Sequence, residues 1–217
     1  MAIDQLDEYE QGEKVRSWLR ENGSSLLTGI LLGLALILGY QWYQGSQVRE
    51  KENAAAQYQA LADAIKAKDD AKIKTFAGEI HAKYADSPFA ALANLRQAQY
   101  LQAGGKNDEA IALLRGAKVP TDPALAELQV LRLSRLLLIA GKPADALKAI
   151  EGRTDSLFPA VLAELRGDIQ LALGKREDAR KSYEQAMTTL DEAAPMRRVV
   201  ELKLIDAGGQ PPAKPET

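Results

Sequence analysis

A single uncharged run constrains this 217-residue chain more than any other feature. No Asp, Glu, Lys, Arg or His lies between Glu21 and Arg49, and residues 26–43 read LLTGILLGLALILGYQWY. A helix rises about 1.5 Å per residue, so about 20 apolar residues cross a hydrocarbon core about 30 Å thick. Aromatic residues flank the run, as they do at membrane interfaces. The run therefore predicts one transmembrane helix over residues 24–44.

Two other interpretations fit part of this pattern. A secretory signal peptide has a basic start and small residues at its cleavage site. Residues 1–23 instead form an acidic head, with six acidic and three basic side chains, and bulky residues 40–44 follow the apolar run. A core helix of a soluble domain would show a polar face, which residues 26–38 lack. We therefore expect an uncleaved anchor.

The charges beside the run predict its orientation. Three basic residues (Lys14, Arg16 and Arg20) precede it closely, and two (Arg49 and Lys51) follow it. This small excess favours a cytoplasmic head and an extracytoplasmic C-terminal domain. The absence of cysteine from the sequence fits either side of the membrane.

The region after the anchor predicts an all-α fold. It is rich in Ala, Leu, Gln, Lys, Arg and Glu, which favour helices, and it lacks alternating β-branched or aromatic runs. The net charge of −2 offers no basic field for nucleic acid. We expect one helical domain over residues 45–206, with a last helix at about 194–205, and a disordered tail over residues 207–217.

Three segments of this domain repeat one pattern. They begin at Gly105, Gly141 and Gly174, which lie 36 and 33 residues apart, and each glycine is followed by lysine. A small residue stands seven positions before each glycine, an alanine five positions after it, and a larger residue nine positions after it. These residues are Ala98, Ser134 and Gly167; Ala110, Ala146 and Ala179; and Leu114, Ile150 and Tyr183.

The pattern has a mechanical explanation. A glycine can end one helix in the left-handed conformation that other residues resist, and small side chains let the two flanking helices approach closely. A period of 33–36 residues with these features resembles the tetratricopeptide repeat. Gln170 and Arg153 depart from it, since a large apolar and a small residue are expected there. The helices at 48–85 lack the glycine and are either a degenerate repeat or an N-terminal cap.

Catalytic, cofactor and metal sites are not predicted. The one histidine, His81, has no cysteine to share a metal, and nothing singles out a serine for it to activate. The Gly-Lys dipeptides lack the following Ser or Thr and the preceding strand of a phosphate-binding loop. A capped helix with a solvated lysine explains them.

Two surfaces are candidates for binding. In the anchor, small residues spaced four apart would let another membrane helix approach. In the repeats, the first helix of each pair would line a groove for a partner segment. The anchor residues are Ser25, Gly29, Gly33, Ala35 and Gly39. The groove residues are Gln99, Gln102, Leu128, Arg135, Leu138, Glu164, Asp168 and Leu171.

Several short motifs follow one another along nearly the whole chain. They are the end of the acidic head at residues 16–23, the Gly-rich span closing on 40–43, the Ala-rich start at 53–58, and residues 90–93. The most specific is Leu-Arg-Gly-Asp at residues 165–168, before the Gly-Lys turn at 174–175. The order of these motifs resembles one family, the YfgM-like ancillary subunits of the SecYEG translocon.

This resemblance implies a non-enzymatic, single-pass protein of the bacterial inner membrane, with its repeats in the periplasm. It implies association with the Sec channel and with a membrane-anchored periplasmic chaperone of the prolyl-isomerase type, and help in the hand-over of secreted proteins. The alternative is a membrane-tethered regulator whose cytoplasmic head sequesters a stress-response regulator. An enzyme dependent on His81 is a third possibility.

Overall fold

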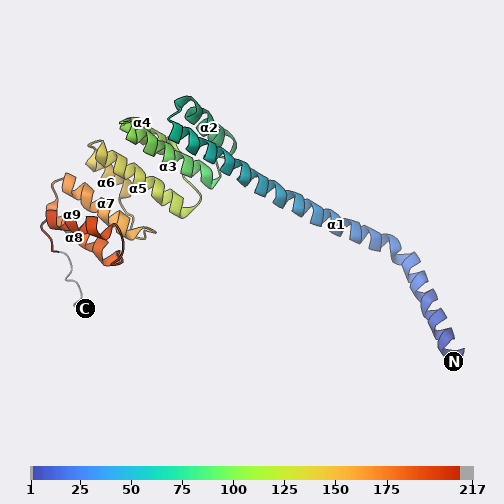
Figure 1. Ribbon diagram of the computed structural model, residues 1–217. Helices are drawn as coiled ribbons and strands as arrows, with labels where there is room; N and C mark the ends of the chain where they lie inside the picture. Colours follow the sequence, from blue (N-terminus) through green and yellow to red (C-terminus); the bar gives the residue numbers. More distant parts are fainter. Residues whose placement is uncertain (1, 211–217) are drawn as a thin grey trace. The chain divides into compact units, whose positions relative to one another are not determined.

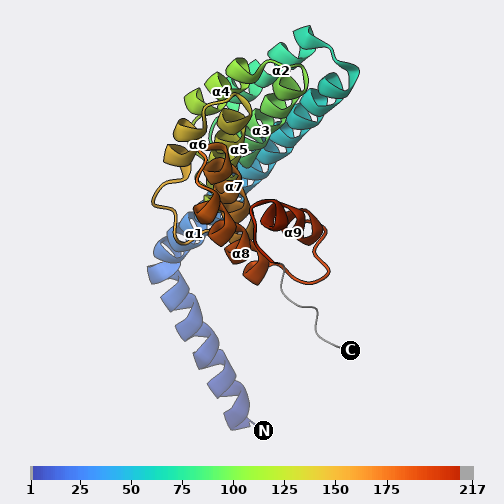
Figure 2. The same cartoon turned by 90° about the vertical axis from the view of Figure 1, so that its left-hand side faces the viewer.

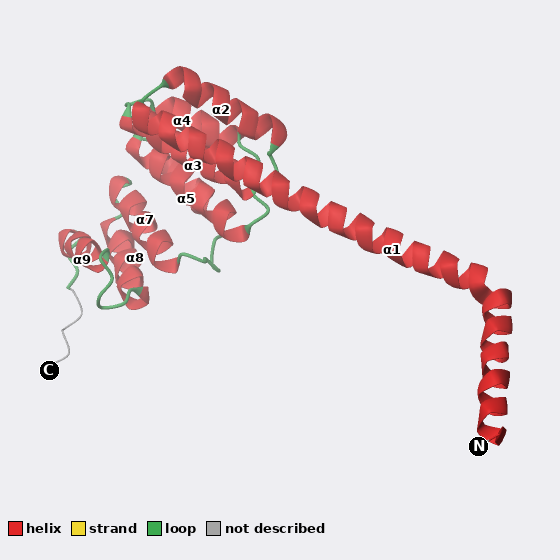
Figure 3. Cartoon of the chain, turned by 45° about the vertical axis from the view of Figure 1, so that its right-hand side comes forward, coloured by secondary structure: helices red, strands yellow, loops and turns green. Residues whose placement is uncertain are grey.

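The computed structural model describes residues 2–210, and helices are the only regular elements among them (Figure 3). The chain divides into two compact units, residues 1–52 and 53–217, which are considered separately below. Figure 1 labels the helices in chain order. Their bounds are α1 Ala2–Ala67, α2 Asp70–Lys83, α3 Pro88–Ala103, α4 Asn107–Gly116, α5 Pro123–Ile139, α6 Pro143–Ile150, α7 Pro159–Ala172, α8 Arg176–Thr189 and α9 Arg197–Asp206.

Helix α1 is longer than the sequence predicts. The pair Asn22-Gly23 predicts the end of a helix and Gly45-Ser46 predicts a loosened segment, but the helix continues through both. The Asn22 amide donates to the carbonyl of Trp18 at 3.1 Å, so it satisfies a backbone group of the helix it was expected to end. The division of α1 into a head, a span at 24–44 and a following helix therefore stays a prediction.

The apolar stretch of α1 is long enough to cross a membrane, judged by length and composition. Its most apolar window has a mean hydropathy of 1.8, and none of that window is buried within the protein. Leu36, for example, is 74% exposed. A core helix would be covered by neighbouring elements, so the exposure argues against that interpretation.

The three predicted repeats form three helix pairs: α3 with α4, α5 with α6, and α7 with α8 (Figure 2). Every residue that the repeat pattern assigned to the contact between paired helices is buried. Ala98, Ser134, Ala110, Ala146, Ala179 and Tyr183 have no exposed surface at all. The all-α fold and the repeat register predicted from the sequence are therefore confirmed.

Left-handed glycines end the first helix of each pair, as predicted. The φ angles of Gly105, Gly141 and Gly174 are 75°, 71° and 75°. The residue after each glycine donates its N–H to a carbonyl five positions earlier, at 2.8, 2.9 and 2.8 Å. These bonds satisfy carbonyl groups that a helix end would otherwise leave without partners.

The same cap occurs at two places without a predicted repeat. Lys68 adopts a φ of 55°, and the N–H of Asp69 donates to the carbonyl of Ala64 at 3.0 Å. Gly208 adopts a φ of 87°, and the N–H of Gly209 donates to the carbonyl of Leu204 at 2.8 Å. Residues 207–209 thus cap α9 rather than begin a tail, and residues 211–217 lie outside the described residues.

The cap at Lys68 identifies the end of α1 and α2 as a degenerate repeat. Counted from Lys68, the contact positions are Leu61, Ile73 and Ala77, all buried. The other repeats place a small residue, an alanine and a large residue there. The first pair reverses these sizes, although Leu61, Ile73 and Ala77 pack together in one buried cluster.

The two departures from the repeat pattern have local causes. The Ser182 hydroxyl donates to Gln170 Oε1 at 2.7 Å, which gives the polar side chain a partner where an apolar one was expected. Arg153 lies beyond the end of α6, in the loop that leads to α7, so no small residue is needed there. The buried carboxylate of Glu127 holds this loop by accepting from the Ser156 hydroxyl and from the N–H of Leu157 at 2.8 Å.

We predict that Gly167→Ala destabilises the helical domain by about 1–3 kcal/mol. A Cβ at Gly167 would lie 2.4 Å from Cε1 of Tyr183, a fully buried ring whose hydroxyl is bonded to Asp168. Gly78→Ala is the matched control, because that helical glycine is exposed and has nothing within 4 Å of its added Cβ. Urea unfolding measures both variants. Gly78→Ala should stabilise by up to about 1 kcal/mol, and equal effects at the two sites would contradict the prediction.

Candidate functional site

A groove of about 380 Å³ lies on the first helices of the repeats. Its lining comes from the end of α1 and from α3, α5 and α7, with none from the second helices of the pairs. The regular alternation of helices places these four on one side of the stack, which the sequence analysis predicted as the partner-binding side. The lining residues are Tyr58, Leu92, Leu95, Arg96, Gln99, Leu128, Leu131, Arg132, Arg135 and Val161.

The groove combines an apolar surface with three arginines and has no acidic residue in its lining. Two of the arginines already have partners within the protein. Arg96 donates to the Tyr58 hydroxyl at 3.2 Å and lies 5.9 Å from the centre of that ring. Arg135 pairs with Glu164 at 2.7 Å. The groove therefore has a positive potential that is only partly neutralised by the protein itself.

Arg132 is the third arginine and differs from the other two. Among the described residues it makes no ion pair, and its Nε is buried without a hydrogen-bond partner. Burial and the nearby charge of Arg135 lower the pKa of Arg132. A guanidinium nevertheless stays protonated at neutral pH, so the groove contains a partly desolvated cation.

The predicted groove residues separate into two groups. Gln99, Leu128 and Arg135 line the groove. Gln102, Leu138, Glu164, Asp168 and Leu171 lie outside its lining. Glu164 is only 3% exposed, and its carboxylate is used within the protein. A role for any of the eight in partner binding stays a prediction.

A polar network joins α5, α7, α8 and α9 beside the groove. Lys203 from α9 contacts the carboxylates of Glu164 and Asp168, the latter at 2.7 Å. Arg135 from α5 contacts Glu164, and the Tyr183 hydroxyl from α8 donates to Asp168 at 2.8 Å. Two cations thus balance two carboxylates that are largely withdrawn from solvent.

The network shifts the two carboxyl groups in opposite directions. Burial would raise the pKa of Glu164, but the hydrogen bond from Lys203 and the charge of Arg135 outweigh it and leave that pKa below its usual value. Burial holds the pKa of Asp168 above its usual value despite the hydrogen bond from Lys203, and the charge of Glu164 adds to this. Burial and the bond to Asp168 also raise the pKa of Tyr183.

The sequence analysis missed several residues that matter here: Tyr58, Arg96, Arg132 and Lys203. Arg132 lies three positions before Arg135 on one helix, so helical spacing predicts that both lie on the same face. Lys203 could not be predicted, because 35 residues separate it from Asp168 and only the folded chain brings them together.

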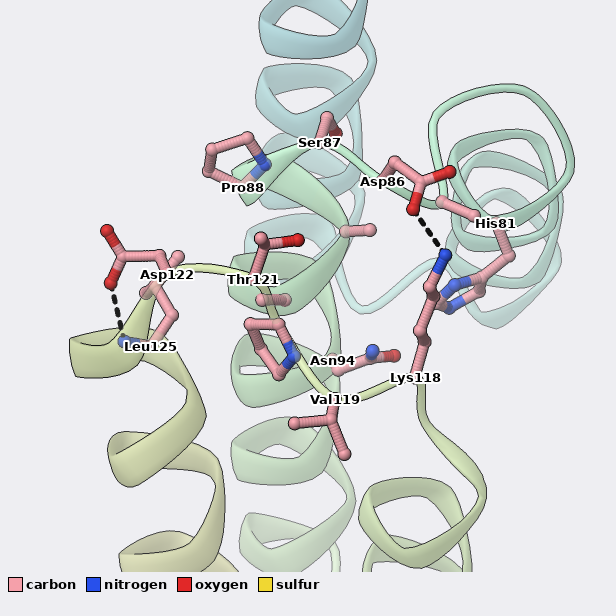
Figure 4. A pocket seen from close by; sticks show the side chains of 14 residues that line it. His81, Asp86, Ser87, Pro88, Asn94, Lys118, Val119, Thr121, Asp122 and Leu125 are labelled. Carbon is pink, nitrogen blue, oxygen red and sulfur yellow. Dashed lines mark hydrogen bonds and ion pairs between the residues drawn. The ribbon is translucent and has the colours of Figure 1, made fainter.

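A smaller cavity of about 80 Å³ lies near His81, between α2, α3 and the loop that follows α4 (Figure 4). Lys118 and Asp86 form an ion pair at its edge. Ser87 before Pro88 is typical of a helix cap, but its hydroxyl makes no capping bond and is buried without a partner. In the part of the chain that was described, no group of His, Cys, Asp and Glu side chains could hold a metal ion.

The small residues of the anchor are open to their surroundings. An added Cβ at Gly29, Gly33 or Gly39 would meet nothing within 4 Å. Their packing against a second membrane helix stays a prediction.

A family model for a tetratricopeptide repeat-like domain matches residues 16–209. Curated relatives cover nearly the same length. The "Ancillary SecYEG translocon subunit" of Haemophilus influenzae is 28% identical over 184 residues, 83% of this chain and 89% of the relative. The protein of that name from Escherichia coli is 27% identical over 200 residues, 91% and 95% of the two chains. The one from Neisseria gonorrhoeae is 25% identical over 201 residues, 92% and 96%. These names describe ancillary subunits of the SecYEG translocon.

We predict that Lys203→Met destabilises the domain by about 2–3 kcal/mol at neutral pH, because it leaves two carboxylates close together with one cation. In the variant the folded-state pKa values of Glu164 and Asp168 would exceed the unfolded ones. The penalty is therefore present above those values and decreases as the pH falls through them. Lys181→Met, at an exposed lysine of α8 without an ion pair, is the control.

Unfolding curves at neutral pH and at about pH 5 measure this difference. Equal losses for Lys203→Met and Lys181→Met, or a loss from Lys203→Met that does not decrease in acid, would contradict the account of the network.

Proposed function

Because the chain belongs to the tetratricopeptide repeat-like domain family, we propose that it is a non-enzymatic scaffold anchored beside a SecYEG-type translocon in the bacterial inner membrane. The observation that carries this proposal is the match to ancillary translocon subunits over 91% of the chain and 95% of the relative. The family model over residues 16–209 includes the apolar segment as well as the repeats. The long exposed apolar stretch of α1 supports a single membrane span.

In this proposal the head is cytoplasmic and the repeats are periplasmic. The span holds the repeats near the exit of the channel and so raises their effective concentration around emerging chains. The groove binds a segment of a membrane-anchored chaperone of the prolyl-isomerase type, which then takes over the secreted protein. The mixed apolar and cationic lining supports recognition of a protein segment.

The cysteine-free sequence allows a direct test of the orientation. We predict that a single cysteine introduced by Lys118→Cys, at an exposed residue, reacts with a membrane-impermeant maleimide in spheroplasts. A cysteine introduced by Glu13→Cys should react only after the membrane is permeabilised. The reverse labelling pattern, or labelling of both before permeabilisation, would contradict a cytoplasmic head and periplasmic repeats.

Co-purification of the full-length protein in mild detergent tests the partners. We expect channel subunits and a periplasmic chaperone to be recovered and identified by mass spectrometry. Leu128→Asp places a charge in the groove and should reduce recovery of the chaperone about tenfold or more, while recovery of the channel stays unchanged. Gly33→Leu should reduce recovery of the channel without preventing insertion, because it fills the small-residue face of the span.

Val119→Asp is a control for the groove variant, since Val119 is an apolar residue that is 72% exposed outside the groove. Equal loss of the chaperone in both variants would contradict a role for the groove. Recovery of neither the channel nor a chaperone would overturn the scaffold proposal. Recovery mainly of a cytoplasmic regulator, lost when residues 1–22 are deleted, would instead support the tethered regulator.

A further inference from the structure

We propose that the groove recognises an acidic segment of its partner, in which a carboxylate flanked by apolar side chains binds Arg132. The inference rests on the proposed function, because it specifies the chemistry of the segment that the groove would hold. It depends on the distribution of charge in the groove and on the state of one arginine.

The three arginines of the groove are not equivalent. Arg96 is held by Tyr58, and Arg135 is held by Glu164. Arg132 alone makes neither an ion pair nor a hydrogen bond with a side chain among the described residues, and its Nε is withdrawn from solvent with its hydrogen bond unmade. A buried donor without a partner is costly, and a partly desolvated guanidinium would gain a strong charge-assisted bond from a carboxylate. Arg132 is therefore the position where an incoming anion gains most.

The apolar residues of the lining indicate which side chains flank that carboxylate in the bound segment. Leu92, Leu95, Leu128, Leu131 and Val161 supply apolar contacts around the arginines. A volume of about 380 Å³ holds a few side chains of a segment but not a folded domain. A segment with apolar side chains on both sides of an acidic residue would contact both the apolar residues and the arginines of the lining. A basic segment would meet the like charges of Arg96 and Arg132 and is disfavoured.

A peptide carboxylate fits this site better than the phosphate of a lipid surface. Four of the apolar lining residues, Leu92, Leu95, Leu128 and Leu131, stand on the same two helices as the three arginines, so an anion that binds there also covers apolar groups. The lining glutamine, Gln99, offers a further neutral hydrogen-bonding group to a peptide backbone. Competition with phosphatidylglycerol in the test below distinguishes lipid from peptide.

The test uses the full-length protein in detergent and measures fluorescence anisotropy of labelled peptides. The probes repeat Leu-Glu-Ser, Leu-Gln-Ser or Leu-Lys-Ser. We expect the Leu-Glu-Ser peptide to bind about tenfold or more tightly than the other two, and Arg132→Gln to remove about tenfold of that affinity. Arg198→Gln, at an exposed arginine outside the groove, should change nothing. Arg132→Glu should transfer the preference to the Leu-Lys-Ser peptide.

Arg132→Gln removes a cation that has no internal partner, so thermal unfolding should show no loss of stability. Equal affinity for the Glu and Gln peptides, or unchanged binding by Arg132→Gln, would overturn the inference. Phosphatidylglycerol added to the detergent micelles that displaces the Leu-Glu-Ser peptide, and binds more weakly to Arg132→Gln, would assign the site to lipid instead.

These outcomes are separate from those of the proposed function. Recovery of the channel by a protein whose groove shows no preference for acidic peptides would refute the inference and leave the scaffold proposal intact. A preference for acidic peptides in a protein that recovers no channel would support the inference and refute the scaffold proposal.

Discussion

The close approach of paired helices is the constraint on which the repeat domain depends. It is tightest where Gly167 of α7 faces Tyr183 of α8, since no side chain fits between the backbone and the ring. The left-handed caps at Gly105, Gly141 and Gly174 return the chain at the angle that this contact requires. A large residue nine positions after each glycine then fills the space between the helices. Small side chains and caps therefore act together, and neither alone would form the stack.

This arrangement leaves the first helices of the pairs with one side free. The second helices cover their other side, so α3, α5 and α7 can line a groove together with the end of α1. Residues on that side do not pack against the second helices, so the repeat pattern of small and large residues does not constrain them. Charged residues such as Arg132 can occupy it without disturbing the helix contacts, which separates the function of the surface from the stability of the fold.

The sequence predicted the fold well because the signals are local. Glycine caps and alanines five positions later can be counted along the chain, and all of them lie where the repeat register places them. The sequence left the first repeat open between a degenerate repeat and an N-terminal cap, because Lys68 replaces glycine and the sizes of Leu61 and Ala77 are reversed. The groove residues were predicted less completely, since only some of them line the groove. Glu164 belongs to the expected helix, but its carboxylate is held by Lys203, which is distant in sequence.

Arg135 connects the fold to the groove. Its guanidinium lines the groove and also pairs with Glu164, whose carboxylate is shared with Lys203 of α9. Lys203 in turn contacts Asp168, which accepts from Tyr183 in the tightest helix contact of the domain. A carboxylate that drew Arg135 into the groove would leave Glu164 with Lys203 alone. The internal pair therefore competes with any anion for Arg135, whereas no internal group competes for Arg132, and this difference directs an incoming carboxylate to Arg132.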